Sequence, residues 1–187
     1  MTAIPFDFRP GTLVESAGVS IRILMPKTRL SLRARTAAVP AISRALGVAV
    51  PEKIGQRASG EGANAETEIL CLGPDEWVLL TDVEQVGTIT AAMDAIYKEH
   101  PHSLVDVSDR EITVEIFGDN ATDLLTLGWP RNPLSVPVGE ARRTVFDGAS
   151  VVIWHDSETS WRLNGWRSFM PHLLGLLVTG CRELSAE

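Results

Sequence analysis

The chain has 187 residues, of which 44% are hydrophobic and 22% are charged, and its formal net charge is -7. This composition is that of an ordinary globular protein, long enough for one substantial hydrophobic core or two small ones. The acidic balance argues against nucleic acid and anionic membranes as partners, because both require clustered Lys and Arg.

The N-terminal segment and the cysteines indicate the compartment. Met1–Pro10 has neither the basic start nor the long apolar run of a secretory signal. The most apolar stretch, residues 169–178, is far shorter than a membrane span. Cys71 and Cys181 lack the spacing of metal or redox pairs, so we expect two buried, reduced thiols. These features predict a cytoplasmic protein with no metal site.

The first predicted elements are extended segments followed by a helix. An apolar pattern from Ser20 to Ala34 is interrupted by Pro26, which predicts two short strands or one kinked edge strand. Residues 36–47 have helical spacing and end at a glycine, which suits the end of a helix. Residues 51–66, rich in glycine, alanine and charge, are expected to form a surface loop.

A hairpin and a second helix come next. The apolar runs 67–72 and 77–81 flank a Gly-Pro-Asp-Glu turn, a combination typical of a β-hairpin. Asp82 and Gln85 have the spacing of a capping box, and the apolar positions between Val86 and Ile96 then mark one face of a helix. With a strand at residues 103–106, this half has the split βαβ order of ferredoxin-like domains.

The second half is predicted to be a variation on the first. Residues 111–117 alternate as a half-buried strand should, and a short helix capped by Asp119 ends at Gly128. Three strands follow, at residues 143–147, 151–156 and 159–163.

The last predicted element is a helix that starts near Ser168. Its apolar stripe is wider than a surface helix needs, and Gly175 and Gly180 remove side-chain bulk from it. We expect this helix to be buried on more than one side, by its own domain or by another chain.

Together these elements predict an α+β fold of two ferredoxin-like βαββαβ-type halves. The predicted organisation is an N-terminal arm (residues 1–19), a first half (20–109) and a second half (110–187), with the halves packed as one compact unit.

Sequence motifs of catalysis are absent. The chain contains no Gly-x-Gly-x-x-Gly, phosphate loop, Gly-x-Ser-x-Gly or His-Glu-x-x-His motif. Asp106, Ser108 and Asp109 gather at a corner between strands, where one carboxylate could act as a general base. Asp and Ser commonly bond to the backbone in turns, and Arg110 is near to neutralise them, so a structural role is preferred.

Aromatic residues indicate surfaces that contact other proteins. Five tryptophans and a single tyrosine suit packing and docking better than acid–base chemistry. Trp129 lies in an irregular segment beside Arg131, where it either anchors an interface or caps the core of its own domain. The interface candidates are Phe6, Phe8, Trp129, Arg131, Trp166 and Leu176.

Three segments have a recognisable order and spacing. They are Leu72–Trp77 (LGPDEW), Val105–Arg110 (VDVSDR), and Arg143-Thr144 leading into residues 151–154 and Arg167–Phe169. Together they resemble the gamma subunit family of heterotetrameric sarcosine oxidase, and the resemblance covers residues 67–184.

The resemblance implies an accessory, non-catalytic subunit of an enzyme that oxidatively demethylates sarcosine to glycine. It implies alpha and beta subunits as partners, with a delta subunit in the same complex. FAD, FMN, NAD and tetrahydrofolate would be held by those partners, and this chain would hold none of them and supply contacts and stability.

A second resemblance provides the alternative. The Asp-Val-Ser corner and residues 118–121 also look like the folate-binding aminomethyltransferase family, which implies a related fold and a stand-alone folate-dependent or folate-binding protein. Its pocket would use Asp106, Ser108 and Arg143. That family is expected to carry an acidic pair where this chain has Trp154 and His155 ahead of a single Asp156, and this departure favours the gamma subunit.

Overall fold

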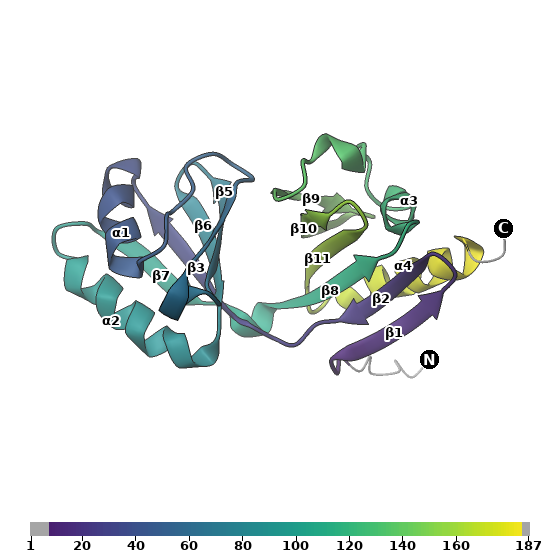
Figure 1. Cartoon of the computed structure of the whole chain (residues 1–187), viewed down its shortest axis with the longest axis horizontal. Coiled ribbons are helices and arrows are strands. Elements are labelled where there is room, and N and C mark those ends of the chain that lie inside the picture. Colours follow the sequence, from purple (N-terminus) through teal and green to yellow (C-terminus); the bar gives the residue numbers. More distant parts are fainter. Residues whose placement is uncertain (1–7, 185–187) are drawn as a thin grey trace. The chain divides into compact units, whose positions relative to one another are not determined.

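The computed structural model describes residues 8–184, which divide into two compact units (Figure 1). The central unit contains residues 27–108, and the terminal unit contains the described residues up to Pro26 together with those from Asp109 onward. Each unit has its own hydrophobic core and its own antiparallel sheet. The fold is therefore mixed α and β, as predicted.

The central unit is a five-stranded sheet with two helices. Its strand order is β4-β5-β6-β3-β7, and every pairing is antiparallel. The strands are β3 (Thr28–Ala34), β4 (Arg57–Ser59), β5 (Glu68–Gly73), β6 (Glu76–Thr81) and β7 (His102–Asp106). Helices α1 (Val39–Leu46) and α2 (Val86–Ile96) bury their apolar sides against this sheet.

The predicted order of strand, helix, two strands, helix and strand is present in the central unit, with β4 added inside the predicted loop. Gly47 ends α1 with φ of 65°, a left-handed conformation that suits glycine. The predicted capping box is wrong in detail. Asp82 precedes a short 3-10 turn, Val83–Gln85, but its side chain makes no capping hydrogen bond.

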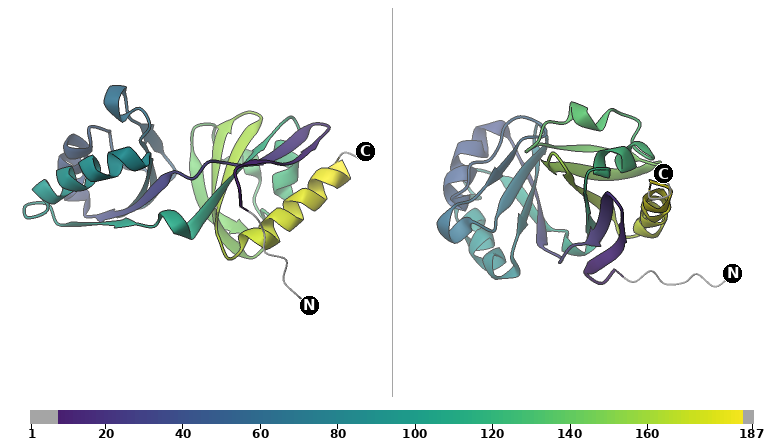
Figure 2. Two further views of the ribbon diagram at one scale, coloured as in Figure 1. Left: turned by 90° about the horizontal axis from the view of Figure 1, so that it is seen from below. Right: turned by 45° about the vertical axis from the view of Figure 1, so that its right-hand side comes forward.

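The terminal unit is a six-stranded sheet in the order β1-β2-β8-β11-β10-β9, again antiparallel throughout. The strands are β1 (Gly11–Ser16), β2 (Val19–Ile23), β8 (Glu111–Phe117), β9 (Ala141–Phe146), β10 (Ala149–Ser157) and β11 (Ser160–Trp166). Helices α3 (Ala121–Thr126) and α4 (Met170–Leu184) contribute to the same core as the sheet. Figure 2 shows α4, in yellow, running along this sheet.

The boundaries of these units differ from the predicted ones. Strand β1 lies inside the predicted arm, and residues 20–23 belong to the terminal unit rather than to the first half. The reason is the pairing of β2 with β8, which places Ile21 beside Ile116, both fully buried. Removal of these two side chains from water stabilises the pairing, since each fully buried isoleucine contributes about 1.5–3 kcal/mol.

The second predicted ferredoxin-like half is not confirmed. After β8 and α3 the chain forms three consecutive antiparallel strands, β9 to β11, before α4. A two-residue turn at Asp147 and Gly148, with φ of 44° and 80°, joins β9 directly to β10. Turns with positive φ at both positions match the twist of adjacent strands, so this segment folds as a meander.

Helix α4 is buried on one side within its unit. Leu173, Leu177 and Cys181 are fully buried, whereas His172 and Gly175 on the other side are exposed. Burial of this helix on further sides, as predicted, would therefore require contacts with another chain. No helix in residues 8–184 is long and apolar enough to cross a membrane.

Both cysteines are buried thiols outside any disulfide within residues 8–184, as predicted. Cys71 belongs to the core of the central unit and Cys181 to that of the terminal unit. Burial raises the pKa of both thiols, which disfavours the reactive thiolate.

Candidate functional site

Asp106 and Ser108 close a turn at the end of β7. The Asp106 carboxylate accepts hydrogen bonds from the Ser108 backbone N–H (2.9 Å) and from its hydroxyl (2.5 Å). The Ser108 Oγ atom in turn accepts from the backbone N–H of Arg29 (3.0 Å). The bonds from Ser108 lower the pKa of Asp106. A carboxyl group with a lowered pKa is a poor general base near neutral pH, so the geometry supports the structural role.

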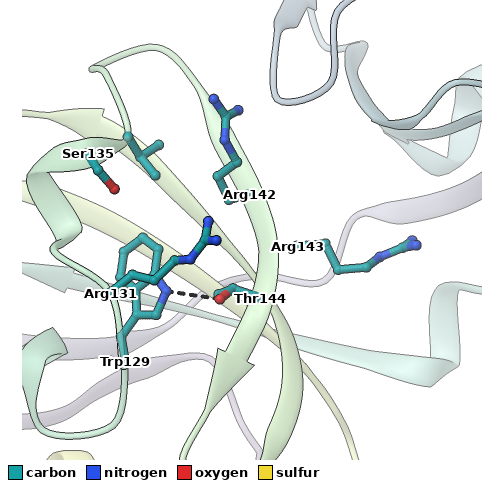
Figure 3. A pocket seen from close by; sticks show the side chains of 7 residues that line it. Trp129, Arg131, Ser135, Arg142, Arg143 and Thr144 are labelled. Atoms are coloured by element: carbon teal, nitrogen blue, oxygen red, sulfur yellow. Dashed lines mark hydrogen bonds between the residues drawn. The ribbon is translucent and has the colours of Figure 1, made fainter.

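The third member of the predicted alternative pocket lies in the other unit. Arg143 is an exposed residue of β9, whereas Asp106 and Ser108 belong to the central unit. Figure 3 shows Arg143 pointing away from Arg131 and Thr144. Of the three candidates, the described contacts bring together only Asp106 and Ser108.

Strand β10 carries the residues found in place of the expected acidic pair. Trp154 is fully buried, and the guanidinium of Arg162 lies over its ring at 4.6 Å. The same guanidinium binds both carboxylate oxygens of Asp156, with Nε–Oδ2 and Nη2–Oδ1 distances of 2.5 and 2.8 Å. The carboxylate of Asp156 is thus engaged in a two-point ion pair.

His155, between these two residues, points to the opposite face of the strand. Its ring is 3% exposed, and its Nδ1 atom is 2.7 Å from the carbonyl oxygen of Val136. Hydrogen bonding to a carbonyl requires Nδ1 to carry the proton. Residues 154–156 therefore serve packing and ion pairing, and they do not fit the amine and folate chemistry of the alternative.

A pocket of about 220 Å³ lies in the terminal unit between β9 and the segment that precedes it (Figure 3). It is lined by Trp129, Arg131, Ser135, Val136, Arg142, Arg143 and Thr144. Of these residues the sequence pointed to Trp129, Arg131 and Arg143 as site candidates, and not to Ser135, Val136, Arg142 and Thr144. The alternation of side chains along β9 is the signal that could have found the latter two on one face.

Trp129 belongs to the core of its own unit. It is 3% exposed, and its indole N–H donates to Thr144 Oγ1 (2.9 Å). Its ring also meets Trp161 edge to face, with centroids 6.1 Å apart. Of the two roles considered for Trp129, the geometry supports core packing, because the indole is almost entirely buried in its own unit and only the part that lines the pocket is left.

Aromatic and arginine side chains are exposed where β11 meets α4. Trp166 and Phe169 are 47% and 45% exposed, with ring centroids 6.4 Å apart. Arg110 lies 5.9 Å from the Trp166 ring centre, and Arg167 lies 5.6 Å from that of Phe8. We call these five residues the β11–α4 surface.

The remaining residues that were predicted to contact other subunits do not belong to the β11–α4 surface. Leu176 is half-buried and packs against the core of the terminal unit. Arg131 is exposed at the pocket. Phe6 lies outside the described residues. Within residues 8–184, no group of three or more His, Cys, Asp or Glu side chains could hold a metal ion.

Comparison with known proteins identifies the family. Residues 32–182 match the sarcosine oxidase, gamma subunit family. The chain belongs to this family. The match begins well before residue 67, where the resemblance seen in the sequence starts, so it includes most of the central unit.

Relatives that are named as sarcosine oxidase gamma subunits can be aligned with nearly the whole chain. The sarcosine oxidase gamma subunit of Corynebacterium sp. (strain U-96) is 29% identical over 172 residues, which cover 90% of this chain and 82% of the relative. The corresponding subunit of Arthrobacter sp. is 26% identical over 177 residues, with 91% and 84% covered.

Solved structures agree with this assignment. Heterotetrameric sarcosine oxidase from Corynebacterium sp. U-96, in complex with pyrrole 2-carboxylate, has a chain that matches with a TM-score of 0.80 and 27% identity, covering 94% of this chain and 90% of that chain. The glycine cleavage system aminomethyltransferase T from Bartonella henselae matches with a TM-score of 0.65 at 13% identity, covering 86% and 45%. The second likeness shows a shared fold alone.

These comparisons confirm the prediction of a sarcosine oxidase gamma subunit, a component of an oxidoreductase complex. They also confirm the predicted likeness to the aminomethyltransferase fold.

Proposed function

We propose that this chain is an accessory subunit that supplies contact surface and stability to a heterotetrameric sarcosine oxidase and takes no part in its chemistry. Its partners are the alpha and beta subunits, with delta in the same complex. Oxidative demethylation of sarcosine to glycine, with FAD, FMN, NAD and tetrahydrofolate, takes place on those partners.

The observation that carries the proposal is the β11–α4 surface. Trp166 and Phe169 leave nearly half of their side chains in water although they lie next to a well-packed core. Aromatic and arginine residues are enriched at the energetically dominant positions of protein interfaces. The guanidinium of Arg110 lies over the Trp166 ring and also pairs with Glu111 at 2.8 Å, so this surface combines an aromatic ring with an ordered arginine.

The side chains weighed for catalysis support the same function. Asp106 is engaged by Ser108, Asp156 by Arg162, and His155 by Val136 and Trp161. Each carries out a structural task in its own unit.

Co-expression with the other subunits, followed by size-exclusion chromatography and an assay of sarcosine oxidation, tests the proposal. We expect the chain to co-elute with them. A Trp166→Ala/Phe169→Ala double variant should weaken association by roughly 30-fold or more, since a single interface anchor already contributes about 2 kcal/mol. Circular dichroism of the free variant checks that it still folds.

The matched control is Tyr97→Ala, which removes an equally exposed aromatic ring from the end of α2 in the central unit. Equal co-elution of the double variant and the wild type would overturn the role of the β11–α4 surface. Binding of tetrahydrofolate by the lone chain, measured by titration calorimetry, would instead support the folate-binding alternative.

A further inference from the structure

The inner wall of the pocket is held by a continuous chain of contacts. Trp129 donates to Thr144 on β9 and meets Trp161 of β11 edge to face. Trp161 stacks on His155 of β10, and His155 bonds to the carbonyl oxygen of Val136, which itself lines the pocket. Because each contact fixes one segment against the next, the wall is set before any ligand arrives.

The outer rim of the pocket is fixed by hydrogen bonds from its own backbone N–H groups. The Asn132 side chain accepts from the backbone N–H of Leu134 (3.0 Å), and the backbone N–H of Ser135 donates to the Asn132 carbonyl (3.0 Å). Further along, the N–H of Gly139 donates to the carbonyl of His155 (2.8 Å). The segment that carries Arg131 and Ser135 is therefore tied down between the core and β10.

The polar groups offered to the pocket are donors. Arg131 makes no ion pair with any residue in the range 8–184. Thr144 uses its oxygen to accept from Trp129, which leaves its hydroxyl hydrogen available. Glu140 pairs with Arg142, which also lines the pocket, at 2.7 Å. In the view of Figure 3 the Arg131 side chain passes the indole of Trp129, and both Arg131 and Thr144 line the pocket.

We propose that this pocket binds a small carboxylate with a short apolar body. A guanidinium and a hydroxyl that line the same pocket can donate to the two oxygens of a carboxylate, and the pocket-lining edge of the indole suits a short apolar group attached to it. The volume of about 220 Å³ is below the roughly 300 Å³ at which pockets for drug-sized ligands begin, so a folate is too large. None of the pocket-lining residues belongs to the β11–α4 surface, so this proposal goes beyond the contacts proposed above.

Benzoate is a suitable probe, and benzamide is its uncharged counterpart. Titration of the full-length chain is followed in proton–nitrogen correlation spectra through the indole N–H of Trp129, whose acceptor Thr144 would bind the ligand. We expect a saturable shift with benzoate and none with benzamide. Arg131→Gln should weaken benzoate binding about tenfold or more.

The matched control is Arg35→Gln, an exposed arginine of the central unit, which should bind benzoate as the wild type does. Shifts that never saturate, or equal affinity in the Arg131→Gln variant, would overturn the proposal. Both arginines are exposed, so neither substitution endangers the fold.

A further titration distinguishes two sources of the carboxylate. If the assembled complex still binds benzoate, the natural ligand is a free small carboxylate. If the assembled complex does not bind benzoate, and Arg131→Gln weakens the association of the subunits, the occupant is an acidic side chain of a partner subunit. Co-elution of the wild-type subunits tests the proposed function separately, so failure of one inference leaves the other intact.

Discussion

His155 stacks on Trp161 with ring centroids 3.6 Å apart and ring planes inclined by 6°. The same imidazole bonds to the Val136 carbonyl and so ties β10 to the segment that borders the pocket. An acidic residue expected here from the aminomethyltransferase resemblance could not stack in this way without burying a charge. The position has a packing role in this chain, which accords with an accessory subunit.

The stack predicts different outcomes for two substitutions. His155→Ala removes the ring from a fully packed site and should lower the free energy of unfolding by about 3 kcal/mol. His155→Phe keeps the stack and should cost under about 1 kcal/mol. It loses the bond to Val136, but it also removes Nε2, a buried atom without a hydrogen-bond partner among the described residues.

Urea unfolding of the wild type and both variants provides the measurement. Equal destabilisation by alanine and phenylalanine would show that the hydrogen bond, rather than the stack, carries the stabilisation. Loss of benzoate binding in a folded His155→Phe variant would show in addition that Val136 must be held in place for the pocket to form.

The turn at Asp106 predicts a dependence on pH. Ser108 lowers the folded-state pKa of Asp106 below its ordinary value. The turn is therefore stabilised above the pKa of the unfolded chain, and this stabilisation is lost as the pH falls through the folded-state pKa. Ser108→Ala should raise the pKa of Asp106 toward its ordinary value, because both the hydroxyl bond and the tight turn are weakened.

Titration of the Asp106 carboxyl carbon by NMR measures this pKa directly. Ser150→Ala, an exposed serine on β10, is the control and should leave the Asp106 pKa unchanged. A wild-type pKa near neutrality would contradict the structural role and support Asp106 as a general base.

Local signals in the sequence were sufficient to predict the main helices and strands of the central unit. The Gly-Pro-Asp-Glu turn predicted the hairpin now seen as β5 and β6, and the glycine at position 47 predicted the end of α1. Both depend on residues close in the chain. The LGPDEW and VDVSDR segments were also sufficient to indicate the family, since their residues and spacing are specific.

Long-range contacts explain what the sequence did not reveal. Strand β1 looked like part of an arm because its partner β2 was assigned to the first half, and the pairing of β2 with β8 joins residues nearly a hundred positions apart. The place of Trp129 depends on Thr144 and Trp161, neither of which is a neighbour in the chain. The pocket depends on the same contacts, so it was not predicted.

Gly118 provides a test of how the N-terminal hairpin is joined to the rest of its unit. It has φ of 122°, and a Cβ atom there would meet the carbonyl oxygen of Gly18 in the β1–β2 turn. That carbonyl also accepts from the backbone N–H of Asn120 (2.9 Å). Gly118→Ala should therefore lower the free energy of unfolding by about 3 kcal/mol or more. Part of this cost is backbone strain at position 118, and part arises because the added methyl group pushes the β1–β2 turn away from Gly118.

Gly11→Ala is the matched control, because Gly11 has φ of 140° but no atom lies within 4 Å of the place that an alanine methyl group would take. It should cost about 1 kcal/mol, from backbone strain alone. Urea unfolding followed by tryptophan fluorescence compares the two variants. If Gly118→Ala costs no more than Gly11→Ala, the β1–β2 hairpin is only loosely attached. A larger cost for Gly118→Ala, within a single unfolding transition, means that residues 11–23 and the segment from Asp109 onward fold as one cooperative unit.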